Sequence, residues 1–257
     1  MSKLIFFDTE TTGNKQKDFL IQIAYKMGSE KFIGLYKPEI KIPPAASAVH
    51  HITNKMVAEK PAFSESEDIE KIKTLFEDEN SIVVAHNAPF DLMIIKKEGI
   101  EPANFICTLR VARHLDKENK IEQYKLQYLR YFLDIEIDAT AHDALGDVLV
   151  LEKLFERLKN KIMSAPTLEE VGVPTASVGK ELTETEAIDK MIEISSHPSL
   201  LRTFNFGKHV GKKIEEVLQT NRDYLEWLLA EKLKSDQIDE DWIYTLKHYL
   251  GNSGKIN

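Results

Sequence analysis

Two acidic residues near the start of the chain are the first whose type and spacing could do chemistry. Asp8 and Glu10 occur in FFDTETTG, directly after the apolar run Lys3–Phe7, which predicts a buried strand. Alternate residues of a strand share a face, so both carboxylates should project to one side, with Thr9 opposite. Such a pair is common at solvated strand ends, so it indicates a site only together with further acids.

A further acid follows another predicted strand. The run SIVVAHN (81–87) is apolar, and Asp91 lies just beyond it, in the first turn of a helix predicted over Ala88–Gly99. An acid at that position also stabilises the helix dipole, which is a purely structural role. Ligand sites in open α/β sheets, however, gather at strand ends.

The segment ATAHDALGD supplies a histidine and another carboxylate. Within one continuous helix, His142 and Asp147 would point in different directions. We therefore expect the helix over 144–158 to begin after His142, with Asp143 as its N-cap. A start at Thr140, with Asp143 in a capping box, is the alternative. Asp143 is also a rival metal ligand.

The elements that must position these residues form a mixed pattern. Three predicted strands come first, and strands and helices alternate afterwards, which indicates a mixed α/β sheet with helices on its faces. The strands are predicted at Lys3–Phe7, Phe19–Met27 and Lys31–Ile40. The paired prolines in Pro43–Thr53 predict a loop there.

The three segments resemble the exonuclease motifs of the DEDDh (DnaQ-like) 3′–5′ exonuclease superfamily. D-x-E-T-T-G, H-N-x-x-F-D and H-D-A-x-x-D occur in that order, and Val49–Thr53 is similar to the V-H-x-I-T element of that family. The resemblance covers residues 3–158 and implies an RNase H-like fold with a mixed five-stranded sheet flanked by helices. It implies His142 as the general base and four metal ligands: Asp8, Glu10, Asp91 and Asp147.

The chemistry of such a set is consistent with metal binding. Four clustered carboxylates repel one another and take up protons unless cations compensate them. Oxygen ligands suit Mg²⁺ or Mn²⁺ better than zinc, so we expect two Mg²⁺ ions, for which Mn²⁺ can substitute. Two such ions can bind the attacking water and the leaving oxygen of a phosphodiester. His142, with a reference pKa of about 6.5, can accept the proton of the water.

The same resemblance implies contacts to the terminal nucleotide. Gly13 would let the backbone approach it, and neighbouring side chains would donate hydrogen bonds or line the base pocket, although Ile52 and Phe90 fit a core equally well. The candidates are Thr11, Thr12, Gly13, His51, Ile52, Asn87 and Phe90. Unpaired bases are held by stacking and apolar contact, so the expected partner is DNA with a single-stranded or frayed 3′ end, with RNA possible.

The chain divides into a catalytic domain (1–163), a linker rich in Pro and Gly (164–183) and a small, mostly helical C-terminal domain (184–257). Phe204–Lys232 resembles the C-terminal domain of exodeoxyribonuclease X-like proteins, through F-G-K-x-x-G-K followed by Y-L-x-W-L-L. Trp227 is expected in its core. Three lysines form a basic cluster that could contact phosphates or could be a solvated loop: Lys208, Lys212 and Lys213.

Composition narrows the function further. The 257 residues carry a net charge of −8, which disfavours a general polyanion binder, and 42% of them are hydrophobic. No signal peptide or membrane span is evident, and the single cysteine, Cys107, is expected to be buried, so a cytoplasmic protein is expected. We predict a metal-dependent 3′–5′ exodeoxyribonuclease that releases 5′-mononucleotides. The alternatives are an RNA-trimming enzyme, a polymerase proofreading subunit and a non-catalytic nucleic-acid-binding module.

Overall fold

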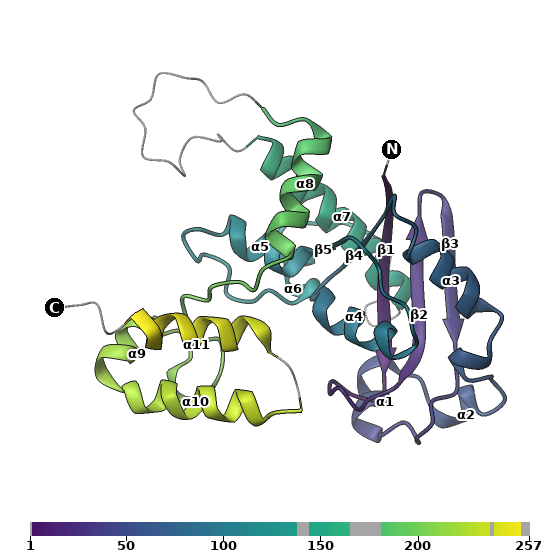
Figure 1. The fold of residues 1–257 in the computed structure, drawn as a ribbon, viewed down its shortest axis with the longest axis horizontal. Helices are drawn as coiled ribbons and strands as arrows, with labels where there is room; N and C mark the ends of the chain where they lie inside the picture. The colour runs from purple at the N-terminus through teal and green to yellow at the C-terminus, as the bar shows by residue number, and fades with distance from the viewer. Residues whose placement is uncertain (1, 138–143, 165–180, 237–238, 253–257) are drawn as a thin grey trace.

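The computed structural model describes residues 2–137, 144–164, 181–236 and 239–252. Within them, a five-stranded sheet has the order β3-β2-β1-β4-β5 (Figure 1). Strands β2 and β3 extend the sheet antiparallel to β1, whereas β4 and β5 run parallel to it. This confirms the predicted mixed five-stranded sheet with flanking helices. The strands are β1 (Lys3–Thr11), β2 (Leu20–Met27), β3 (Glu30–Leu35), β4 (Ser81–Ala85) and β5 (Phe105–Cys107).

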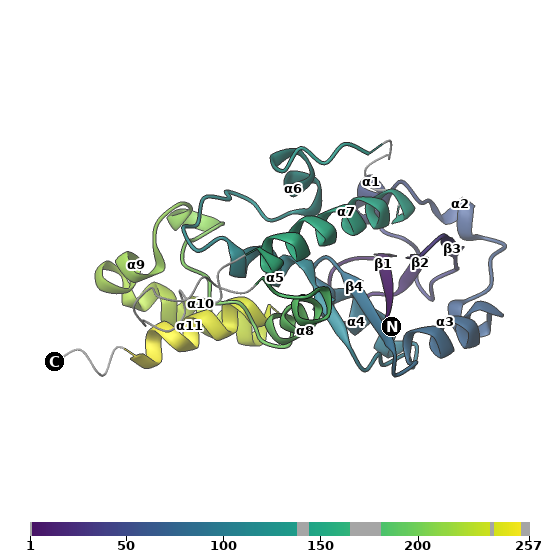
Figure 2. The same ribbon diagram turned by 90° about the horizontal axis from the view of Figure 1, so that it is seen from above.

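The central strand β1 separates two hydrophobic cores, because its side chains alternate between the faces of the sheet. Phe6 packs edge-on against Phe155 of α7 (Ala144–Met163), with ring centroids 5.3 Å apart. Phe7 faces the other side and meets Phe76 of α3 (Asp68–Phe76) at 5.1 Å. Helix α5 (Thr108–Leu115) shares the first core, and α4 (Ala88–Lys97) shares the second. Figure 2 shows α7 above the sheet and α3 and α4 below it.

The predicted loop over Pro43–Thr53 is wrong in part, because Pro44–His50 forms helix α1. Pro44 occupies the start of this helix, where the missing N–H has no intrahelical partner to lose and the fixed φ suits the first turn. The remaining elements between β3 and α7 are α2 (Asn54–Val57), the 3₁₀ helix η1 (Phe63–Glu65) and α6 (Leu126–Phe132).

The C-terminal part contributes to two different cores. Helix α8 (Glu184–Ser195) places Ala187 and Met191 in the first core, beside α5 and α7. The rest builds a core of its own, in which Phe204 and Trp242 are buried. This second unit contains the 3₁₀ helix η2 (Gly207–His209) and the helices α9 (Ile214–Thr220), α10 (Arg222–Lys234) and α11 (Glu240–Asn252).

Trp227 does not belong to that core, so its predicted position is wrong. It is 55% exposed, whereas Leu225 and Leu228 of the same helix are buried. The two leucines already supply the buried face of α10, and Trp227 projects from a different face.

A cluster of ion pairs joins the small C-terminal unit to helix α5 of the unit that contains the sheet. Arg110 and Arg113 of α5 both contact Asp241 at the start of α11, and Arg110 also pairs with Glu240 at 2.5 Å. Asp241 in addition accepts a hydrogen bond from the backbone N–H of Ser199, at 2.8 Å. The small unit is therefore held by specific charged contacts as well as by the chain connection. Among the described helices, none has the length and apolar character that crossing a bilayer requires.

Candidate active site

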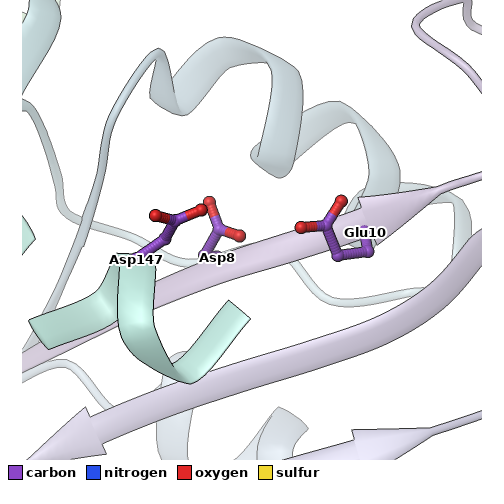
Figure 3. A group of neighbouring side chains, drawn as sticks. All are labelled: Asp8, Glu10 and Asp147. Atoms are coloured by element: carbon purple, nitrogen blue, oxygen red, sulfur yellow. The ribbon is translucent and has the colours of Figure 1, made fainter. Parts of the chain in front are cut away.

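Three carboxylates from two distant segments of the chain meet at the end of β1. Asp8, Glu10 and Asp147 each have a carboxylate oxygen within 4.8 Å of the others. Figure 3 shows Asp147 reaching from α7 toward Asp8, with Glu10 further along β1. Oxygen ligands at this mutual spacing can share a divalent cation.

The packing of β1 explains why these groups meet. Phe6, Asp8 and Glu10 occupy every second position of the strand and therefore share one face, and Phe6 packs on α7. The side that faces α7 in the core therefore becomes acidic where the strand leaves the core. Asp147 lies in the first turn of α7, and Val148 and Leu151 fix this part of the helix against the sheet.

Asp91 is buried beside this group, although it is not one of the three that cluster most tightly. It lies in the first turn of α4 and is 4% exposed. One oxygen of Asp91 accepts hydrogen bonds from the Thr9 backbone N–H at 3.1 Å and from the Thr9 hydroxyl at 2.7 Å. Thr9, which separates Asp8 from Glu10 in the sequence, thus ties the fourth acid to the same strand.

The acids strongly affect one another's protonation. Burial raises the pKa of Asp8 well above its usual range, and the charges of Asp91, Glu10 and Asp147 raise it further. Burial also raises the pKa of Asp91 to about 7, against the effect of the two Thr9 hydrogen bonds. A bound cation removes this penalty, because it replaces repulsion by attraction. The donor set therefore fits divalent metal ions.

Asp147 has a supporting residue that the sequence alone did not indicate. The side-chain amide of Gln127, on α6, donates a hydrogen bond to the Asp147 carboxylate. Arg130 contacts the Gln127 side-chain oxygen at 3.4 Å and donates to the backbone carbonyl of Ile137 at 2.5 Å. Helix α6 therefore positions a member of the acidic cluster. The signal available in the sequence was a polar pair, three residues apart, on an otherwise apolar and aromatic helix.

The predicted general base lies outside the described residues. The same applies to both alternative N-caps, Asp143 and Thr140, and hence to the rival ligand role of Asp143. The described part of the helix starts at Ala144. The role of His142 thus stays a prediction.

The T-T-G part of the first motif builds the turn after β1. The Thr12 hydroxyl donates to Asp18 at 3.1 Å and accepts from the backbone N–H of Phe19 at 3.0 Å, while the Thr11 hydroxyl donates to the Gly13 carbonyl at 2.5 Å. A Cβ on Gly13 would come within 2.6 Å of an Asp18 oxygen. A side chain at this position would displace the Asp18 carboxylate, so the packing of Asp18 by itself favours glycine here.

The predicted pocket residues differ in their exposure. His51 is exposed and caps α1 with a left-handed backbone, φ 61°, whereas Ile52 is buried in a small cluster with Ile21. His50, which sequence reasoning passed over, is the histidine of V-H-x-I-T. It is buried, its Nδ1 accepts the Ile52 N–H at 3.0 Å, and its Nε2 has no partner among the described residues.

The residues of the second motif, H-N-x-x-F-D (86–91), also differ in their exposure. Asn87 is exposed, with a left-handed backbone of φ 69°, and precedes α4. Phe90 is half-buried against the second core. His86 is held on both ring nitrogens, by the Thr108 hydroxyl at 2.9 Å and the Tyr124 carbonyl at 2.6 Å.

The three predicted lysines lie on one exposed turn of the small unit. Lys208 lies over the ring of Tyr224, with 4.5 Å between Nζ and the ring centroid. No described carboxylate pairs with Lys208, Lys212 or Lys213. This turn belongs to the small unit and is separate in sequence from the acidic cluster.

Comparison with protein-family models gives two matches. The family described as Exonuclease matches residues 5–155, and the one described as Exodeoxyribonuclease X-like C-terminal matches residues 204–232. Among relatives, Exodeoxyribonuclease 10 of Escherichia coli (strain K12) is 31% identical over 222 residues, which cover 85% of this chain and 84% of the relative. The DNA polymerase III subunit epsilon of Treponema pallidum (strain Nichols) is 34% identical over 58% of this chain and 73% of that protein.

Two solved structures of exonucleases have a fold similar to that of this chain. Exonuclease X, determined in complex with 5′ overhanging duplex DNA, matches with a TM-score of 0.53 and 25% identity, over 75% of this chain and 99% of that chain. A product-bound exonuclease I matches with a TM-score of 0.52 and 19% identity, over 62% of this chain and 44% of that chain. The second likeness concerns the fold alone, and both agree with the RNase H-like architecture expected from the motifs.

Proposed function

The chain belongs to the exonuclease family, and on that premise we propose that it is a 3′–5′ exodeoxyribonuclease that releases 5′-mononucleotides from DNA. The observation that carries the proposal is the carboxylate cluster of Asp8, Glu10 and Asp147, with Asp91 buried beside it. The match to E. coli Exodeoxyribonuclease 10 over 84% of its length supports DNA as the substrate.

The acidic residues would hold two Mg²⁺ ions, for which Mn²⁺ can substitute. When bound, the ions supply a nucleophilic water and neutralise the charge that develops on the phosphodiester oxygens. Asp8 would be the central member of this set, since the charges of Glu10, Asp147 and Asp91 all act on it. Thr9 fixes the orientation of Asp91, and Gln127 fixes that of Asp147.

His142 is proposed as the general base that removes the proton of the attacking water. Its support is the H-D-A-x-x-D motif, in which it precedes Asp147. A histidine with an ordinary pKa of about 6.5 is partly neutral at physiological pH and can accept that proton. Replacing it with Ala should lower the rate by about 10²–10⁴-fold while Mn²⁺ binding is kept.

The terminal nucleotide is proposed to bind beside the turn 12–19. Asn87 and His51 are exposed and can contact it, and the backbone at Gly13 can approach it. Thr11, Thr12 and Ile52 are buried, so they would shape the site from behind. Phe90 is half-buried and would contribute one face to a base. Since unpaired bases are held by stacking, a single-stranded or frayed 3′ end is the proposed substrate.

The proposed contribution of the small unit is to hold DNA away from the cleaved end, through Lys208, Lys212 and Lys213. Lysines position phosphates without reading the sequence. Replacing all three with Ala should weaken DNA binding and reduce its salt dependence by about one unit of slope per lysine. Unchanged binding of the triple variant would remove this role.

Digestion of end-labelled oligonucleotides tests the whole proposal. With Mg²⁺ or Mn²⁺, DNA with a free 3′ end should be shortened stepwise, whereas a blocked 3′ end or added EDTA should stop the reaction. Faster digestion of a matched RNA would instead favour the RNA-trimming alternative, which shares these motifs. Absence of hydrolysis with any substrate and metal would favour a non-catalytic binding module.

A proofreading subunit is the second candidate, supported by the match to the polymerase III subunit epsilon of T. pallidum. That match covers 58% of this chain, whereas the relative from E. coli covers 85%. The C-terminal match, residues 204–232, is to the exodeoxyribonuclease X-like domain and favours the first candidate.

A further inference from the structure

The basic turn of the small unit is built on a fixed backbone. Gly207 and Gly211 have left-handed backbones, with φ of 68° and 80°, which glycine adopts without strain. Phe204 uses both backbone groups to close the turn: its N–H donates to the Lys212 carbonyl at 2.9 Å, and its carbonyl accepts from Gly211 at 2.7 Å. The turn therefore presents its side chains from a defined frame.

The lysines of this turn lie at the surface of the small unit. Lys208, Lys212 and Lys213 are exposed, and none of them forms an ion pair with a described residue. Lys208 instead lies over the ring face of Tyr224, at 4.5 Å. His209 adds an aromatic edge, 4.7 Å from the same ring. Burial and the charges of Lys208 and Lys212 lower the pKa of His209.

An exposed indole extends this aromatic surface. The rings of Tyr224 and Trp227 lie 5.4 Å apart on successive turns of α10, with 34° between their planes. Trp227 is 55% exposed, in contrast to Trp242, which is 3% exposed in the core. A half-exposed tryptophan beside a cation over an aromatic ring is a surface suited to bases with flat π faces.

Two of the three acids of α10 lie close to a basic residue of the same helix. Glu226 is paired with Arg222 at 2.8 Å, and Glu231 lies 3.7 Å from Lys234. Asp223 is the remaining exposed acid of the first two turns of α10. The turn thus brings the Lys208 ammonium to the ring that neighbours the exposed indole, while Glu215 and Glu216 at the start of α9 offset part of the charge of Lys212 and Lys213.

We propose that Tyr224, Trp227 and Lys208, which we call the Trp227 face, stack on an unpaired base of a single nucleic-acid strand while Lys212 and Lys213 contact the flanking phosphates. The exposed lysines favour an anionic partner, and the indole favours one that carries flat bases. The identity of that polymer rests on the proposed function, whereas the stacking geometry does not. Stacking tolerates every base, so this site would grip without reading sequence.

Tryptophan fluorescence tests the proposal directly, since the chain contains two tryptophans. The full-length protein in EDTA is titrated with single-stranded oligo(dT) and, separately, with an abasic strand of the same length. Stacking on Trp227 should quench the emission with oligo(dT), whereas the abasic strand should bind without that quenching. The buried Trp242 provides the residual emission.

Variants separate stacking from charge. Trp227→Ala should weaken oligo(dT) binding by roughly 5- to 100-fold, the range for losing one base–aromatic stack. Trp227→Phe should keep most of the affinity and lose the quenching. Tyr244→Ala is the matched control, because Tyr244 is also an exposed aromatic, 44% exposed, but lies on α11. Its binding should equal that of the wild-type protein.

Three outcomes would overturn the proposal: equal quenching by the abasic strand, unchanged affinity of Trp227→Ala, or displacement of oligo(dT) by poly-glutamate at equal charge concentration. The assay requires no hydrolysis. A protein that shows the quenching and digests no substrate would therefore contradict the proposed function and leave the Trp227 face intact.

Discussion

Replacing Gln127 with Leu removes the amide that donates to the Asp147 carboxylate and keeps a side chain of similar size. A hydrogen bond to a charged group contributes about 1.5–3 kcal/mol net. Two consequences follow from its loss. The metal-free protein loses up to that amount of stability, and Asp147 loses the contact that restricts its orientation toward Asp8 and Glu10.

The second consequence sets the expected effect on metal binding. Removing a residue that orients a metal ligand usually lowers metal affinity by about 10- to 100-fold. We expect Gln127→Leu to weaken Mn²⁺ binding within that range, as measured by calorimetry. The rate should recover toward the wild-type value when Mn²⁺ is raised in proportion, because the ligands themselves remain.

Two further variants of α6 test whether the effect depends on the contact with Asp147. Phe132→Leu changes an exposed residue of the same helix and should leave Mn²⁺ affinity unchanged. Arg130→Met removes the group that contacts Gln127 from behind and should weaken Mn²⁺ binding in the same direction, to a smaller extent. An unchanged Mn²⁺ affinity in Gln127→Leu, accompanied by a lower melting temperature, would show that the hydrogen bond is structural only and refute the reasoning.

Three further perturbations probe other parts of the molecule. Asp8→Asn should abolish hydrolysis, yet raise the melting temperature of the metal-free protein, because burial and three neighbouring carboxylates disfavour the charged form of Asp8. Mg²⁺ should no longer stabilise this variant. Calorimetric melting with and without Mg²⁺ measures both the higher melting temperature and the lost stabilisation by Mg²⁺. His86 has its pKa lowered to about 4 by burial, so the unfolded chain binds a proton that the folded protein does not. Stability should fall as the pH falls from 6.5 toward 4, by at most about 3 kcal/mol from this group, and urea unfolding of His86→Gln over that range should show a shallower slope. Asp241→Asn removes the carboxylate that Arg110 and Arg113 share, while Arg110 keeps its pair with Glu240. The variant should be less stable and its junction more open to limited proteolysis, and a proteolysis pattern identical to that of the wild-type protein would contradict this role.

The sequence predicted the site best where reactive residue types occur at the spacing of a regular secondary structure. The period-two alternation at Asp8 and Glu10 predicts a shared face, and the structure places both with Asp147. Strand β5 was not located because Phe105–Cys107 is too short for periodicity to show. Helix α1 was missed because paired prolines were interpreted as breakers, although Pro44 stands at a helix start.

Contacts between distant residues lay beyond sequence reasoning. Arg113 and Asp241 are separated by 128 positions, and no local pattern relates them. The bond between Gln127 and Asp147 depends on how α6 packs on α7, which the spacing of apolar residues does not specify. The exposure of Trp227 was missed for a related reason, because tertiary packing decides which of several apolar residues on a short helix reach the core.

The acidic cluster depends on the register of β1 more than on any single bond. Phe6 and Asp8 share the side of α7, while Phe7 and Thr9 share the side that leads to α3 and α4. A slip by one residue would remove both phenylalanines from their cores and turn the carboxylates away from Asp147. The two hydrophobic cores therefore fix the strand in the only register that gathers the acids. Their burial supplies the free energy that keeps mutually repelling carboxylates together before a cation binds.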